Sequence, residues 1–192
     1  RDVLGSRGLG DVYKRQREQS ERLMEFTESY RRLSYMPEPK KKRFSLTDSL
    51  HNLGLLLQSD FENAHIHFIL RSTPSDIYIE GDEKQLSQVF LNLLKNSMQS
   101  LEGKTDGQIE VTLEVTDKLY IKLLDNGQGI PMELQEKIFV PFFTTKTEGT
   151  GIGLSLCRQI IKRHGGNLYL QESGQGRTLF VIEWPIVPFI PK

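Results

Sequence analysis

The sequence predicts an α+β fold, in which helices gather on one face of a mixed, largely antiparallel sheet and one long helix precedes them. Two kinds of pattern support this prediction. Several segments place apolar residues three and four positions apart, as amphipathic helices do, and other short segments alternate apolar with polar residues, as half-buried strands do. The 192 residues, 37% hydrophobic and 26% charged, suffice for one globular domain with an appendage.

The N-terminal part of the chain divides into a leader, a helix and a linker. Residues 1–16 are expected to be a disordered or non-native leader, because three glycines in six residues argue against a helix. Residues 17–36 are expected to be helical, with apolar side chains spaced as in a coiled-coil seam, which needs a partner. These side chains are Leu23, Phe26, Tyr30 and Leu33. Residues 37–42, which begin with a proline and contain three lysines, are expected to be a solvated linker.

Seven short strands are expected in the rest of the chain, each rich in apolar or β-branched residues. In chain order they are 43–46, 67–70, 77–80, 108–115, 119–124, 167–171 and 178–183. A turn at Asp117 and Lys118 joins the fourth to the fifth, and a glycine-containing turn at 173–176 joins the last two. Each of these two pairs is therefore expected to form one antiparallel ladder.

Two helices are expected between the early strands. The first covers 47–63, with leucines on one face and Thr47 or Asp48 as its N-cap. Asp82 is expected to cap the second helix, which continues to about residue 101.

The helix that begins at Asp82 has an unusual polar face. Asn92, Lys95, Asn96 and Gln99 stand at i, i+3, i+4 and i+7, and therefore share one side, while leucines can meet the core. Amide oxygens can ligate Mg²⁺, and an ammonium can meet phosphate oxygens. Considered alone, this side of the helix fits a solvated outer face equally well.

A motif with the pattern Asp-x-Gly-x-Gly follows the fifth strand, at Asp125, Gly127 and Gly129. The glycines let the backbone approach a flat ligand closely. A carboxylate at a strand end can accept hydrogen bonds from an exocyclic amine such as that of adenine. On its own, the motif also fits a plain glycine turn.

A short helix over 131–138, which starts at a proline, and a loop over 139–150 lead to a last helix over 152–164. The loop contains three phenylalanines and Lys146, and its aromatic residues suggest a lid or a partner surface, or simply anchors on the core. Glycines at 149, 151 and 153 expose backbone N–H groups at the start of the last helix, which favours phosphate. A tight helix entry is the alternative explanation for these glycines.

The order of these motifs resembles one family. Asn92 and Asn96, then the glycine motif after Asp125, then the phenylalanines, then Gly149-x-Gly-x-Gly153 follow one another within about 60 residues. This series resembles the N, G1, F and G2 boxes of the sensor histidine kinase catalytic domain, in the GHKL superfamily. The resemblance implies a Bergerat-type α/β sandwich over 43–187, with a tail at 188–192.

The resemblance also implies roles for individual residues. Asn96 would ligate Mg²⁺, with Asn92 and Lys95 on the triphosphate side. Asp125 would hold the adenine amine, with Thr178 supporting it through water. The residues implied to be catalytic are Asn92, Lys95, Asn96 and Lys146. Those implied to bind ATP are Asn92, Asn96, Asp125, Gly127, Gly129, Ile130, Thr145, Lys146, Gly149, Thr150, Gly151, Ile152, Gly153, Leu154 and Thr178.

The implied activity is transfer of the γ-phosphoryl group of ATP to a histidine, followed by relay to an aspartate of a response regulator receiver domain. The helix at 17–36 resembles the second helix of the hairpin that dimerises and carries that histidine, so a homodimer of the full-length protein is implied. The acceptor histidine normally precedes this helix, and no histidine lies upstream of residue 17. We therefore expect a fragment that binds ATP but does not phosphorylate itself.

Three other function classes stay open at this point, of which a protein-only interaction domain would explain the seam of the helix at 17–36 but not the glycine motifs. GHKL-type ATPases resemble one another in having a glutamate four residues before the Mg²⁺ asparagine, but that position here is Asn92, and an amide is no general base. An ATP-binding scaffold without activity, a pseudokinase, would share the fold, although all four boxes look intact.

Composition disfavours some partners and locations. Lysine plus arginine and aspartate plus glutamate number 25 each, so no basic excess suggests a nucleic-acid partner. No apolar run is long enough for a transmembrane helix. Cys157 is the only cysteine, which suits the cytoplasm. The chain could still be the cytoplasmic part of a membrane-bound sensor.

Overall fold

The computed structural model describes residues 34–146 and 149–185, together with residues 16, 17, 20, 24, 27, 30 and 31. The described positions from 16 to 34 are helical, as predicted, whereas Tyr35 and Met36 are not. Of the predicted seam, Tyr30 is described and is 56% exposed. Leu23, Phe26 and Leu33 lie outside the described residues, as do the tail at 188–192 and all but the last residue of the leader.

A five-stranded sheet forms one layer of the domain, and its strands lie in the order β2-β4-β5-β7-β6. The strands are β2 Ile66–Thr73, β4 Gly107–Val115, β5 Leu119–Asp125, β6 Asn167–Gly174 and β7 Arg177–Trp184. Only β2 and β4 pair in parallel within this sheet, and the other three pairs are antiparallel. This arrangement confirms the predicted mixed, largely antiparallel sheet. The expected pairings of β4 with β5 and of β6 with β7 are also present.

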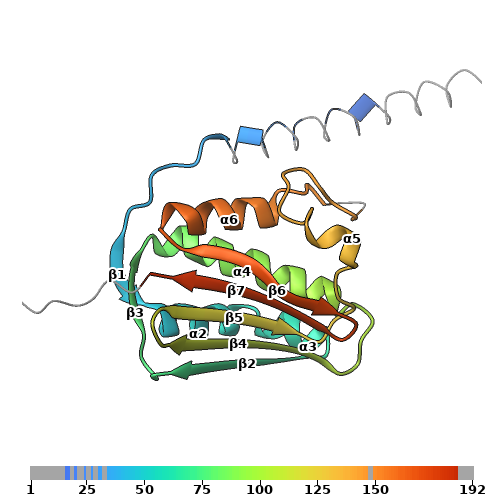
Figure 1. Cartoon of the computed structure of the whole chain (residues 1–192). Coiled ribbons are helices and arrows are strands. Elements are labelled where there is room, and N and C mark those ends of the chain that lie inside the picture. Colours follow the sequence, from blue (N-terminus) through green and yellow to red (C-terminus); the bar gives the residue numbers. More distant parts are fainter. Residues whose placement is uncertain are drawn as a thin grey trace, which may run out of the picture.

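Two of the predicted strands do not join this sheet. β1, Lys42–Ser45, and β3, Tyr78–Gly81, pair with each other in a separate antiparallel ribbon. The ribbon lies at the edge of the domain where the chain enters it (Figure 1).

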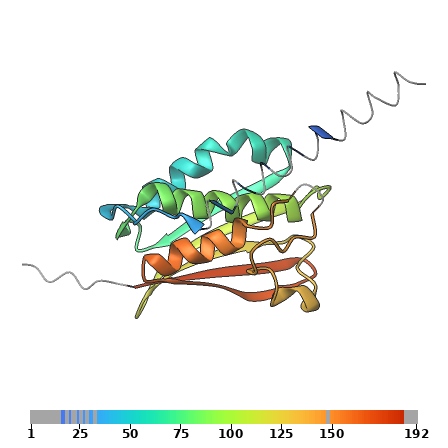
Figure 2. The same ribbon diagram turned by 90° about the horizontal axis from the view of Figure 1, so that it is seen from above.

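Three helices cover one face of the sheet, with α4 between α2 and α6 (Figures 1 and 2). They are α2 Leu46–Leu56, α4 Glu83–Ser100 and α6 Gly153–Arg163. The shorter α3 Gln58–Asn63 follows α2 and contacts β2, and α5 Met132–Gln135 precedes α6. Buried leucines and isoleucines of the helices pack on those of the strands and form one core. Burial of this apolar face stabilises the helices on the sheet.

The helix boundaries follow capping chemistry, with one difference from the prediction. Asp82 caps α4 by accepting hydrogen bonds from the N–H groups of Lys84 and Gln85, as predicted. Neither Thr47 nor Asp48 caps α2, because the Ser45 hydroxyl accepts the Asp48 N–H at 3.1 Å. The Thr47 hydroxyl instead accepts the N–H of Ile77 at 3.2 Å, and so ties α2 to the strand ribbon. The predicted helix over 47–63 is also divided in two at residue 57.

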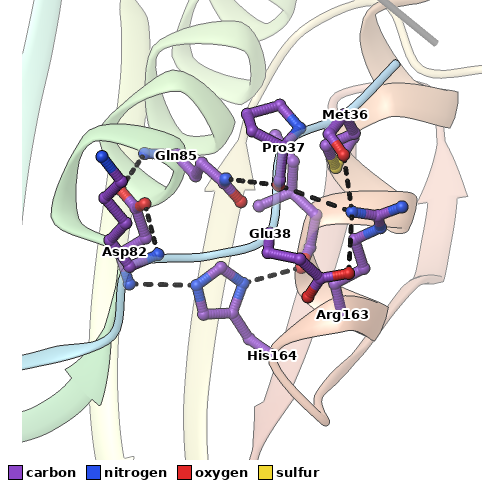
Figure 3. A network of polar contacts seen from close by, with 9 residues as sticks. Met36, Pro37, Glu38, Asp82, Gln85, Arg163 and His164 are labelled. Atoms are coloured by element: carbon purple, nitrogen blue, oxygen red, sulfur yellow. Dashed lines mark hydrogen bonds and ion pairs between the residues drawn. The ribbon is translucent and has the colours of Figure 1, made fainter. Parts of the chain in front are cut away.

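Residues 36–40, which we call the linker strap, are mostly exposed, as expected of a solvated linker, but they are also fastened to the domain (Figure 3). The Arg163 guanidinium donates to the carbonyl of Met36 at 2.7 Å, and the Gln85 amide donates to that of Pro37 at 3.2 Å. The Lys40 N–H donates to the Asp82 carboxylate at 2.9 Å. The strap is thereby fastened to the N-terminal end of α4 and the C-terminal end of α6.

His164 holds these two helix ends together beneath the strap. Its Nε2 accepts the N–H of Asp82 at 3.0 Å, and its Nδ1 lies 2.8 Å from the carbonyl of Ile160. An Nδ1–H tautomer satisfies both contacts. The ring is buried and lies 5.5 Å from that of Trp184.

Candidate functional site

A cavity of about 870 Å³ opens at the end of the helices opposite the strap, between α4, the loop after α5, the start of α6 and the turn between β6 and β7. Cavities of this size hold ligands as large as nucleotides. The predicted site residues that line it are Asn96, Asp125, Gly129, Ile130, Thr145, Lys146, Gly149, Thr150, Gly151, Gly153, Leu154 and Thr178. Segments far apart in the sequence therefore meet around one space.

Asp125 lies at the inner wall of the cavity, at the end of β5, and is 2% exposed. Its Oδ1 accepts hydrogen bonds from the Ser100 hydroxyl at 2.9 Å and from the Gly127 N–H at 3.0 Å. Its Oδ2 accepts one from the Ser97 hydroxyl at 2.9 Å. Thr178 is its partner across the ladder on β7, and the Thr178 hydroxyl also hydrogen-bonds to the Asp125 carboxylate.

Burial and hydrogen bonding act in opposite directions on the pKa of Asp125. Burial raises it, because the charged carboxylate loses water. The bonds from Gly127, Ser100, Ser97 and Thr178 lower it, because they stabilise the charge, but the net pKa still lies above its ordinary value. The carboxylate is therefore a buried acceptor that its neighbours hold in place by donating to it.

Two glycines of the cavity wall have conformations that other residues rarely adopt. Gly129 has a φ of 79°, and a Cβ there would lie 2.1 Å from the carbonyl oxygen of Gly174. Gly151 has a φ of 68°, and its Cβ would lie 2.5 Å from the carbonyl carbon of Phe142. At both positions glycine permits close contact between two backbone segments and so determines the shape of the wall.

Lys146 spans the cavity from the loop to α4. Its ammonium lies 3.3 Å from Oδ1 of Asn96 and also donates to the side-chain oxygen of Gln99. Burial lowers the pKa of Lys146. The amide oxygens of α4 thus already accept a cation in this cavity.

Four predicted residues do not line the cavity. Lys95 is exposed, and Gly127 acts through its N–H on Asp125. Ile152 is buried at the start of α6, where its carbonyl accepts the Ser155 hydroxyl. Asn92 hydrogen-bonds to the buried thiol of Cys157 between α4 and α6.

The sequence analysis missed the serines that hold Asp125. Ser97 is 1% exposed, and with Ser100 it forms the side of α4 that faces the carboxylate. The signal was present, because Ser97 interrupts the apolar spacing that runs from Leu94 to Leu101. A hydroxyl at a core position of a helix needs a polar partner.

Comparison with known proteins identifies the family. Residues 81–188 match the family described as histidine kinase-, DNA gyrase B- and HSP90-like ATPases. Sensory histidine kinase/phosphatase NtrB of Rhodobacter capsulatus is 30% identical over 183 residues, which cover 89% of the chain. The chain belongs to the sensor histidine kinases. Sporulation kinase A of Bacillus subtilis is 35% identical to this histidine kinase chain over 146 residues, or 76% of it.

Solved structures of histidine kinases share the fold. The catalytic domain of histidine kinase ThkA has a TM-score of 0.69 and 34% identity, over 76% of this chain and 95% of that one. A structure of ThkA in complex with the response regulator protein TrrA has a TM-score of 0.72 and 28% identity, over 91% of this chain and 50% of that one. The predicted α+β sandwich of a histidine kinase catalytic domain is thus confirmed.

This histidine kinase chain corresponds to only part of its relatives. It covers 24% of Sporulation kinase A and 51% of NtrB. It contains the ATP-binding catalytic domain of the family. Among the described residues, no helix has the length and apolar character that crossing a membrane requires.

Proposed function

We propose that this domain transfers the γ-phosphoryl group of ATP to a histidine on a dimerisation hairpin, from which it passes to an aspartate of a response regulator. The supporting observation is the set of polar groups that line the cavity: a buried acceptor carboxylate, and an ammonium with two amide oxygens. ATP has the complementary polarity, with an amine on its base and anionic oxygens at its far end.

Individual residues then have defined tasks. Asp125 accepts the adenine amine, and Thr178, its partner across the ladder, supports it through water. Backbone N–H groups at the start of α6, reached past Gly151 and Gly153, face the phosphates. Lys146 neutralises phosphate charge from the loop. Phosphoryl transfer depends mainly on such positioning and charge stabilisation, so these groups suffice to orient the γ-phosphate towards an acceptor.

Magnesium fits one side of this cavity. The donor set is suitable, because Mg²⁺ prefers oxygen ligands and is commonly held by one or two protein groups together with substrate phosphates. Asn96 Oδ1, which already accepts the Lys146 ammonium at 3.3 Å, would hold the ion. When bound, Mg²⁺ neutralises charge on the phosphates.

Asn92 supports kinase rather than hydrolase chemistry. A water-activating base must reach the attacking water, but the Asn92 amide hydrogen-bonds to Cys157 and does not line the cavity. An amide also cannot take up the proton. ATP turnover to free phosphate should therefore be slow, which a phosphate-release assay would measure.

Calorimetric titration with a non-hydrolysable ATP analogue and Mg²⁺ tests the nucleotide site. We expect binding by the chain and its loss in Asp125→Ala, and loss of the Mg²⁺ dependence in Asn96→Ala. Asp117→Ala, an exposed aspartate beyond the far end of β5, is the matched control and should bind as the parent does. No binding by the parent chain would rule out the proposal for this chain.

The acceptor and the partners are also proposals. None of the four histidines resembles the acceptor motif, and His164 is buried with both ring nitrogens engaged. Incubation with γ-labelled ATP should therefore leave no acid-labile label on this chain, and such a label would refute the expectation. The ThkA complex with TrrA supports a response regulator as partner. Dimerisation through the N-terminal helix and a cytoplasmic location are further parts of the proposal.

A further inference from the structure

The Asp125 carboxylate is surrounded by hydroxyl groups from one helix. The Ser97 hydroxyl donates to Oδ2 at 2.9 Å, and the Ser100 hydroxyl lies 2.9 Å from Oδ1. These two residues occupy the last turn of α4, just after Asn96. The helix that carries the proposed magnesium ligand therefore also holds the carboxylate of Asp125.

The two hydroxyls differ in the number of acceptors that they contact. Ser97 is 1% exposed and donates to Asp125. Ser100 has a second acceptor, the carbonyl of Ser97 at 2.8 Å, and one hydroxyl hydrogen cannot serve both acceptors fully. We therefore expect Ser97 to have the larger effect on Asp125.

The protonation of a buried carboxyl decides what it can bind. An ionised carboxylate only accepts hydrogen bonds, whereas a protonated carboxyl also donates one. Burial favours the protonated form of Asp125, and the hydroxyl donors oppose this. The Gly127 N–H adds a donor at 3.0 Å that cannot reverse its role, because a backbone N–H never accepts.

We infer that Ser97 and Ser100 are positioning residues that keep Asp125 an acceptor, and that they thereby select a base presenting an amine, such as adenine, over one presenting a carbonyl, such as guanine. This inference rests on the proposed function, in which Asp125 receives the base. A buried site built for one hydrogen-bond pattern rejects the opposite pattern strongly, because a polar group is left unpaired. We expect the chain to prefer ATP over GTP by about a hundredfold or more.

The test is calorimetric titration of ATP and of GTP into the chain, Ser97→Ala, Ser100→Ala and the double variant. Each serine variant should reduce the preference for ATP, Ser97→Ala by about tenfold, which is the scale of a lost hydrogen bond to a charged group. Ser100→Thr keeps the hydroxyl and should retain the preference. Ser87→Ala, the same change in the first half of α4, is the matched control and should behave like the parent.

The outcomes separate this inference from the proposed function. If the chain binds neither nucleotide, the proposed function is wrong and the inference with it. If the chain prefers ATP but the serine variants bind both nucleotides more weakly by the same factor, the serines have only a structural role and the inference alone is overturned. An unchanged preference in Ser97→Ala, Ser100→Ala and the double variant would also overturn it. Thermal unfolding of each variant checks the fold, and the half-buried Ser100 is the safer position if Ser97→Ala unfolds.

Discussion

A methyl group added at Gly153 should stabilise the fold and weaken nucleotide binding. Gly153 is the first residue of α6 and lines the cavity, and a Cβ there would have no heavy atom of another part of the protein within 4 Å. Its φ is not among the positive values in the chain. Gly153→Ala therefore causes no clash in the protein, and its only crowded neighbour would be a ligand at the helix terminus.

The magnitudes follow from this geometry. Alanine is favoured over glycine in a helix by roughly 0.5–1 kcal/mol, and the lower end applies at the first helical residue. For a protein of this size, about 0.5 kcal/mol raises Tm by about 1–2 °C. If phosphates lie against the N–H groups of α6, the methyl group displaces them. We then expect ATP affinity to fall about tenfold, which corresponds to about 1.4 kcal/mol of binding free energy.

The assay combines thermal unfolding with titration of adenosine and of ATP. Adenosine should bind Gly153→Ala as it binds the parent, whereas ATP should bind about tenfold more weakly. Gly129→Ala is the contrasting variant, because its φ of 79° and the 2.1 Å approach to Gly174 should lower stability by more than about 1 kcal/mol. A destabilised Gly153→Ala would contradict the open space at α6, and unchanged ATP affinity would refute phosphate binding there.

Further predictions concern other parts of the domain. Because the pKa of Asp125 is higher in the folded state than in the unfolded chain, the folded state binds a proton more readily. The contribution of Asp125 to the free energy of unfolding therefore falls as the pH rises above 3.8, the ordinary pKa of an aspartate. Asp125→Asn should remove that trend in urea unfolding measured from pH 4 to 7. Burial raises the pKa of Cys157 to about 12, so a thiol reagent at pH 8 should react only after unfolding, and rapid reaction of the native protein would contradict its burial. Arg163→Ala should loosen the linker strap and accelerate tryptic cleavage in the basic run 40–43 several-fold, whereas its exposed neighbour Lys162→Ala should not.

The sequence predicted features that depend on near neighbours in the chain. The N-cap at Asp82 needs only the next turn of helix, and the hairpin of β4 and β5 needs only a short turn. The nucleotide motifs were likewise recognisable because their glycines and polar residues keep a fixed order. Twelve of the predicted site residues line the cavity, as expected of motifs that meet at one end of a sheet.

Features that depend on distant partners were not predictable. Thr47 has good capping chemistry, but Ile77, thirty residues away, uses its hydroxyl. The exposure of the linker follows from its local charges, but its attachment does not, because Arg163, which fastens it, lies more than 120 residues later. Nothing within the segment at 43–46 shows that it pairs outside the main sheet, because strand propensity does not specify a partner.

The position of β7 constrains how the domain can be synthesised. Among the described residues this strand is the last in chain order, yet it lies between β5 and β6 and contributes Trp184 to the core. While a ribosome still holds residues 177–184, β5 has an unpaired edge and β6 has no neighbour to pair with. The earlier strands therefore stay incompletely paired, with backbone N–H and C=O groups of β5 open to pairing with other chains, until β7 has been translated. A stop codon just before β7 would remove a central strand rather than a dispensable end.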